Sequence, residues 1–252
     1  MFRLFAILLL LAFPAGAQEK VVAGLTQKWV SIDANFDGTG ILIFGAVKRE
    51  APPPDAGPLE VVIAVAGPSH PVTVRKKARK LGIWVNHDSV EIDEAPVFYA
   101  VASTKPLKEV LSETEDARHK VSINKMIRSV GNAATPHAED FTEAVVRIRH
   151  NNSLYSETGG VVELTDETLF NTQINLPSNL VEGDYVARFF LTRDKQVVDV
   201  FETTIAVRKV GLERWIYNLA HQLPLVYGLL SLAIAIAAGW LASAVFRILR
   251  LN

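Results

Sequence analysis

A long uncharged apolar stretch near the C-terminus is the feature that most constrains this chain. Residues 225–246 carry no charged side chain and lie between Pro224 and Arg247. As an α-helix the stretch would reach about 33 Å, enough to cross a hydrocarbon core of about 30 Å. We therefore predict one membrane-spanning helix over residues 224–247, followed by a short tail at 248–252. A buried core helix is the alternative.

A second apolar segment lies at the N-terminus and is too short to span a bilayer. Arg3 precedes an apolar run over residues 4–13, and an A-x-A site follows at residues 15–17. A positive start, a short apolar run and a small-residue site are typical of a secretory signal peptide. We expect residues 1–17 to be removed. Residues 18–210 would then lie outside the membrane and the C-terminus inside, although the basic residues flanking the spanning helix do not decide this by themselves.

Residues 211–223 predict a short amphipathic helix, at the membrane surface or under the exported part, because apolar residues recur there at helical spacing. Within the span, small side chains fall at successive i+4 positions. They are Ser231, Ala235, Gly239 and Ser243. Such a stripe lets a second helix approach closely, so we predict a packing face here. Chance occurrence in an alanine-rich span is the alternative.

The first part of the exported region, residues 18–105, is expected to be β. Short runs rich in β-branched or aromatic residues alternate with turn-forming residues, among them a proline-rich loop at 52–58. The expected strands are 28–32, 40–47, 59–66, 72–74, 82–85 and 97–103. Short strands joined by turns predict an immunoglobulin-like β-sandwich.

A helical insert is expected at residues 106–154, where the composition changes. Residues 107–118 and 140–149 have no internal Gly or Pro and show apolar residues at helical spacing, which predicts two helices. Strands resume over residues 155–210. The expected strands are 161–164, 169–176, 183–192 and 197–207. The fold class is therefore mainly β with a helical insert, and one sandwich or two are both compatible with the sequence.

Composition excludes several kinds of chemistry. The 26 basic and 27 acidic residues nearly cancel, so no global field favours a nucleic-acid partner. The absence of cysteine excludes disulfides, a thiolate nucleophile and cysteine-ligated zinc. We expect no catalytic residues, no metal site and no cofactor.

The densest charge in the sequence is a basic cluster that starts at Arg75. Its five members are Arg75, Lys76, Lys77, Arg79 and Lys80. On a strand, Arg75, Lys77 and Arg79 would share one face. Such a face is suited to hold an oxyanion or to contact anionic lipid head groups, so these three residues are candidates for that contact. A solvated edge strand, protected from sheet pairing by its lysines, is the interpretation that the pattern favours, because charged edges are a routine device.

Histidine and serine residues raise an enzymatic alternative. His87 stands close to acidic residues but matches no known ligand spacing, and a polar hairpin at residues 86–88 explains it better. Ser69-His70 and Ser156 lie outside a G-x-S-x-G elbow. An envelope hydrolase or metalloenzyme is therefore disfavoured.

Several short motifs occur together in a fixed order. They are Phe44-Gly45-Ala46 after Asp37-Gly38-Thr39, Val65-Ala66-Gly67-Pro68-Ser69, Val74-Arg75-Lys76-Lys77 with Gly82-Ile83-Trp84-Val85-Asn86, Phe98-Tyr99-Ala100-Val101-Ala102-Ser103, Leu176-Pro177 with Gly183-Asp184-Tyr185, and Tyr227-Gly228 with Gly239-Trp240. In this order the chain resembles a family of alphaproteobacterial transmembrane proteins without an assigned activity. The resemblance covers nearly the whole mature chain.

The resemblance implies a location in the bacterial cell envelope. With the signal peptide, it leads us to expect a single-pass inner-membrane protein with a periplasmic N-terminal part and a cytoplasmic C-terminus. Genes of the family tend to lie beside transporters of the sulfite-exporter (TauE/SafE) type, which is an association and not a mechanism.

Two hypotheses follow. The first is a non-catalytic module that binds or regulates another inner-membrane protein, of which a TauE/SafE-type transporter is the one implied by the resemblance. Self-association through the membrane helix is the other form of this idea, and the lipid bilayer is a further partner. The second is a tethered small-anion-binding protein that uses Arg75, Lys77 and Arg79, with backbone amides near residues 67–69.

Overall fold

The computed structural model describes residues 19–33, 35–49, 57–128 and 138–249. It divides into two compact units. The first comprises residues 1–30 and 37–207, and the second residues 31–36 and 208–252. The predicted signal peptide at residues 1–17, residues 52–56 of the proline-rich loop and the last three residues of the predicted tail lie outside the described residues.

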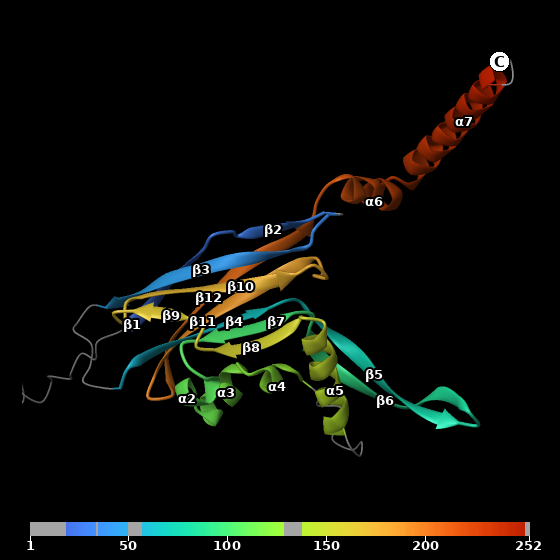
Figure 1. Ribbon diagram of the computed structural model, residues 1–252. Helices are drawn as coiled ribbons and strands as arrows, with labels where there is room; N and C mark the ends of the chain where they lie inside the picture. Colours follow the sequence, from blue (N-terminus) through green and yellow to red (C-terminus); the bar gives the residue numbers. More distant parts are fainter. Residues whose placement is uncertain (1–18, 34, 50–56, 129–137, 250–252) are drawn as a thin grey trace, which may run out of the picture. The chain divides into compact units, whose positions relative to one another are not determined.

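The first unit is built on two β-sheets and a separate ribbon, so the mainly-β prediction is confirmed (Figure 1). A four-stranded sheet has the order β1 (Glu19–Leu25), β3 (Gly38–Arg49), β10 (Leu169–Pro177), β9 (Glu163–Thr165). A six-stranded sheet has the order β2 (Trp29–Ile32), β12 (Gln196–Lys209), β11 (Gly183–Arg193), β4 (Leu59–Ala66), β7 (Tyr99–Ser103), β8 (Tyr155–Gly159). β5 (Ser69–Lys80) and β6 (Ile83–Pro96) pair only with each other among the described strands and form the β5–β6 ribbon.

The strands before and after the helical insert share both sheets. β10 pairs with β3, and β11 pairs with β4. The strand order does not confirm an immunoglobulin-like sandwich, because β7 and β8 run parallel. Two parallel neighbours need a long crossover connection, and here the helical insert supplies it.

Both faces of the six-stranded sheet are covered at its central strands β11, β4 and β7. Successive side chains of β11 point to opposite faces. Phe189 lies 6.2 Å from Phe170 of the four-stranded sheet, measured between ring centroids, whereas Phe190 packs into a cluster with the helices. Phe98 and Tyr99 are both buried, although sequence alternation favours one inside and one outside. That expectation was wrong because the sheet has no exposed face at this point.

Within the described part of the chain, four helices cover the second face of the six-stranded sheet (Figure 1). They are α2 (Leu107–Val110), α3 (Glu113–His119), α4 (Ile123–Met126) and α5 (Ala138–Asn151). The single helix expected over residues 107–118 is therefore wrong. Leu111 is extended, with φ −139° and ψ 134°, and the Ser112 hydroxyl accepts a hydrogen bond from the Glu115 N–H at 3.3 Å. A serine cap at this position starts a new helix.

In its described residues the second unit contains two helices. α6 (Leu212–Gln222) occupies the segment for which the sequence predicts an amphipathic helix. α7 (Pro224–Leu249) contains the predicted span, and among the described residues it is the one helix that is long and apolar enough to cross a membrane. A proline lacks a backbone N–H and is tolerated at the first turn of a helix, so Pro224 starts α7 and separates it from α6.

Candidate functional site

The β5–β6 ribbon is partly packed and partly exposed. Near its base Val72 and Val74 pack against the cluster between the six-stranded sheet and the helices. From Arg75 outward most β5 side chains are exposed. The ribbon, turquoise in Figure 1, therefore runs out beyond the sheets that support its base.

The basic side chains lie on the outer half of this ribbon. Arg75, Lys77 and Arg79 alternate along β5 and so share one face, as expected from the sequence. The strand register adds Trp84 to that face, because Trp84 pairs with Arg79. The predicted contact with an oxyanion or with lipid stays a prediction.

Charge changes sign along the ribbon. Residues 75–87 contain five basic and no acidic residues, whereas residues 88–94 contain four acidic and no basic residues. Because Asp88 pairs with Lys76 and Glu91 with Thr73, the acidic part lies toward the base. The ribbon therefore has a cationic outer half and an anionic inner half.

The tip of the ribbon (residues 81–84) is apolar and partly strained. Lys80 pairs with Ile83, which leaves a two-residue turn at Leu81 and Gly82 with φ 51° and 86°. Positive φ at both positions is typical of a type I′ turn, which favours Asn-Gly and costs a leucine about 1 kcal/mol. Leu81 is 104%, Ile83 64% and Trp84 68% exposed. The fold therefore leaves large apolar groups exposed at this turn.

The polar hairpin expected at residues 86–88 is wrong. These residues lie inside β6, where Asn86 pairs with Lys77 and Asp88 with Lys76. His87 is therefore the extra residue of a β-bulge, which inserts one residue into a strand without ending it. Its Nδ1 atom lies 3.2 Å from the Asp88 Oδ1 atom, with both side chains about half exposed. Among the described residues no group of three or more His, Cys, Asp or Glu is arranged to hold a metal.

Ser69 and His70 lie at the base of the ribbon, opposite Pro96 and Ala95. Just before them the Gly67 N–H donates to the Phe98 carbonyl oxygen at 2.8 Å. This amide is one of those considered for anion binding near residues 67–69. Its hydrogen bond within the chain leaves it less suited to that role.

Ser156 lines a groove of about 530 Å³ between β7, β8 and β10. Its polar lining also includes His150, Ser153, Thr158, Gln173 and Asn175. Sequence reasoning did not bring His150 and Ser156 together, because they lie on a helix and a strand. Tyr155, also in the lining, donates to the Pro96 carbonyl oxygen at 2.7 Å, and burial raises its pKa to about 12. Tyr155 is therefore a structural hydrogen-bond donor and not a base near neutral pH.

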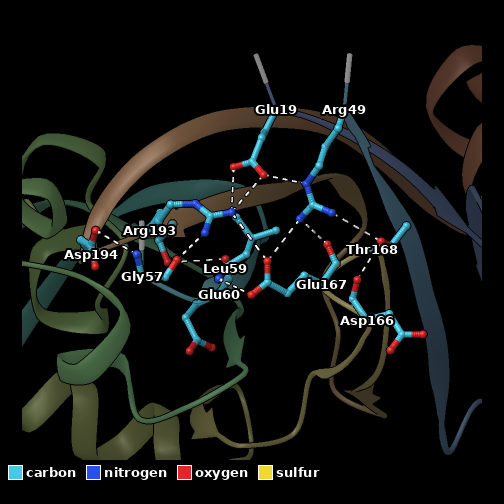
Figure 2. A network of polar contacts seen from close by, with 11 residues as sticks. Glu19, Arg49, Gly57, Leu59, Glu60, Asp166, Glu167, Thr168, Arg193 and Asp194 are labelled. Carbon is cyan, nitrogen blue, oxygen red and sulfur yellow. Dashed lines mark hydrogen bonds and ion pairs between the residues drawn. The ribbon is translucent and has the colours of Figure 1, made fainter. Parts of the chain in front are cut away.

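A buried ion-pair network joins strands at one end of the two sheets (Figure 2). Glu19 lies 2.7 Å from Arg49 and 3.0 Å from Arg193, and the Glu167 carboxylate lies 3.6 Å and 3.7 Å from the same two arginines. Burial alone would raise the pKa of Glu19, but the hydrogen bonds and charges of Arg49 and Arg193 outweigh it and hold this pKa below its ordinary value. The network ties β1 to β3 and β11. No sequence pattern singles it out.

The small-residue stripe lies on α7. Ser231, Ala235, Gly239 and Ser243 are exposed in the structure, and a Cβ atom added to Gly239 would meet no atom within 4 Å. The Ser231 hydroxyl donates to the Gly228 carbonyl oxygen at 3.0 Å, so it is satisfied within its own helix. The stripe is therefore open to a helix from another chain.

A family model described as "Putative transmembrane protein (Alph_Pro_TM)" matches residues 20–248. No curated protein matches the chain.

Proposed function

Because the chain belongs to this family of transmembrane proteins, we propose that it is a single-pass, non-catalytic module that binds or regulates another protein of its membrane. The observation that carries the proposal is α7. Its most apolar window has no side chain buried by the rest of the described chain, and one of its faces is a continuous row of small residues. Small residues let helix backbones approach closely in a bilayer, where van der Waals packing drives association.

The orientation forms part of the proposal. Residues 18–210 lie in the periplasm and the C-terminus in the cytoplasm, with α7 in the inner membrane. The signal-peptide pattern at residues 1–17 supports this orientation. The partner is another inner-membrane protein, and a TauE/SafE-type transporter is the one brought forward by the gene association of the family.

Crosslinking and co-purification from native membranes test the proposal. The matched pair is Gly239→Ile, on the small-residue face, and Ala237→Ile, about 160° away around the helix. Isoleucine should remove the partner at position 239, because its branched side chain blocks close approach, and leave it in place at position 237. Full recovery with both variants would reject packing through this face. If the protein crosslinks only to a second copy of itself, and Gly239→Ile removes this crosslink, the result would identify self-association instead.

Binding of a small anion is a second candidate. It is supported by Arg75, Lys77 and Arg79, which are exposed on one face of the ribbon. Sulfite, sulfate or phosphate should then raise the melting temperature of the full chain in detergent. Replacement of the three residues by glutamine should abolish that rise. An unchanged melting temperature in all three salts would reject this candidate.

A further inference from the structure

We propose that the tip of the β5–β6 ribbon inserts into the anionic surface of the bilayer that holds α7, which gives the chain a second membrane contact. The inference uses residues that the helix-packing proposal does not use. It stands on the chemistry of the tip, the distribution of charge along the ribbon and the place where the ribbon leaves the sheets.

The chemistry of the tip points away from a purely structural turn. Leu81 has a positive φ, for which Asn or Asp is the usual side chain, and it is fully exposed. Backbone conformations that local preference disfavours cluster at functional sites. Ile83 and Trp84 extend the apolar surface, and tryptophan is enriched where water meets lipid. These three residues suit the boundary between head groups and acyl chains.

The charges select an anionic surface and limit the depth of contact. All five basic residues lie on β5 before the tip, and the acidic residues begin on β6 at Asp88, opposite Lys76. At about 3.3 Å per residue, the section free of acidic residues, from Lys77 to Leu81, extends for about 13 Å. Lysine and arginine near a membrane surface are attracted to anionic lipids, whereas carboxylates are repelled. The sign change therefore keeps the base of the ribbon in water.

The connectivity of the six-stranded sheet supports the bilayer of α7 as this membrane. Gly183 pairs with Val207 near the C-terminal end of β12, and Val186 pairs with Ala66 at the C-terminal end of β4. β5 begins three residues after Ala66, so the ribbon leaves the six-stranded sheet at the end from which β12 continues toward α6 and α7. Figure 1 shows the ribbon running outward from that end. The ribbon and the connection to α7 therefore leave the six-stranded sheet at the same end, which makes the bilayer of α7 the membrane that we propose for the tip.

Protection of an edge strand explains less. Lysines on a ribbon with exposed edges would discourage pairing with other sheets. That role needs no leucine, isoleucine or tryptophan at the turn. A polar Asn-Gly turn would serve it better and with less backbone strain.

The test uses native tryptophan fluorescence of the full chain in lipid nanodiscs held together by a non-aromatic polymer in place of a scaffold protein. Trp29, Trp215 and Trp240 are replaced by phenylalanine, which leaves Trp84 as the reporter. The discs contain phosphatidylcholine alone or mixed with phosphatidylglycerol, with bromine on the upper acyl chain as a quencher. We expect Trp84 emission to shift to the blue and to be quenched in the mixed discs, and much less in phosphatidylcholine.

The matched control places the reporter at the opposite end of the six-stranded sheet. Trp84→Phe with Gln196→Trp moves the single tryptophan beside the β11–β12 turn, where the side chain is also exposed. This reporter should remain unquenched in both lipids. Melting curves followed by circular dichroism establish that both variants are folded.

Four results would overturn the proposal. Quenching of Trp84 no greater than that of the control in either lipid would mean that the tip does not insert. Equal quenching in both lipids would mean that charge plays no role in the contact. Quenching only by brominated vesicles added to unbrominated discs would assign the tip to a facing membrane. Replacement of Arg75, Lys77 and Arg79 by glutamine should weaken the lipid contact at least about tenfold, and an unchanged contact would contradict the charge argument.

The discs contain no other protein, so failure here is separate from failure of helix packing. If Trp84 stays in water, crosslinking from position 84 in native membranes shows whether a protein occupies the tip. A protein crosslink without lipid quenching would replace the proposal.

Discussion

The protein contains two long hairpins with the same kind of turn and opposite surroundings. β11–β12 turns at Asp194 and Lys195, with φ 49° and 64°, and β5–β6 turns at Leu81 and Gly82, with φ 51° and 86°. Nearly all side chains of the second half of β11 are buried, whereas those of the outer half of β5 are mostly exposed. The packed hairpin has the polar turn, and the exposed hairpin has the apolar one.

This difference shows what apolar residues do in each hairpin. In β11 they fill the layers on both faces of the sheet, and the Asp194 carboxylate at the turn accepts a hydrogen bond from the Gly57 N–H at 3.3 Å. In β5–β6 the outer apolar residues contact little of the described chain. Burial in the core therefore accounts for the first set and not for the second.

The largest expected effect concerns aromatic rings in the two hairpins. Phe189→Ala should lower the free energy of unfolding by about 3 to 5 kcal/mol, because it leaves a cavity between Phe170 and Phe201. Trp84→Ala should change it by no more than about 0.5 kcal/mol, because the side chain is exposed. Guanidinium unfolding of the full chain in detergent, followed by circular dichroism, measures both. Equal losses would mean that the ribbon tip belongs to the core.

The next effect concerns the basic residue directly before each turn. Arg193→Ala should cost about 3 kcal/mol, because it removes a partner from a buried carboxylate at Glu19. Lys80→Ala should cost no more than about 0.5 kcal/mol. The same unfolding assay compares them. A large loss for Lys80→Ala would contradict the view that the ribbon cations act outside the fold.

A smaller effect is the pH dependence of stability, which should depend on the Glu19 partner of the packed hairpin and not on the ribbon. The lowered pKa of Glu19 means that its ion pairs stabilise the fold above the ordinary glutamate pKa and that this stabilisation is lost as the pH falls through the lowered value. Melting temperature against pH should therefore fall less steeply on the acid side for Glu19→Gln than for the original chain. His87→Gln, in the ribbon, should leave that slope unchanged. Parallel curves for Glu19→Gln and the original chain would reject this role of Glu19.

The smallest effect has the opposite sign. Leu81→Asn should stabilise the chain by about 0.5 to 1 kcal/mol, because asparagine tolerates the positive φ that strains leucine. The same variant should weaken lipid quenching of Trp84. Asp194→Asn gives the matched change in the packed hairpin and should show no effect on quenching. Destabilisation by Leu81→Asn would mean that Leu81 contributes to folding.

Much of the strand pattern could be predicted because runs of β-branched and aromatic residues lie between turn-forming residues. The expected strands at 59–66, 169–176 and 183–192 agree closely with β4, β10 and β11. The sequence predicted the turn of the ribbon at residues 86–88, because Asn and Asp are turn-forming residues and leucine, which occupies the first turn position at Leu81, is not. The register overrode local preference, and a bulge absorbed His87.

The membrane helix and the basic cluster follow from the sequence alone. Length without charge and density of charge are local properties, and no folding is needed to recognise them. The tertiary structure decided how distant segments meet. It joined Glu19 to Arg193, placed strands from both ends of the chain in the same sheets, and left Leu81, Ile83 and Trp84 exposed. Such contacts depend on register and on which faces become covered, and these arise only when residues far apart in the sequence pack together.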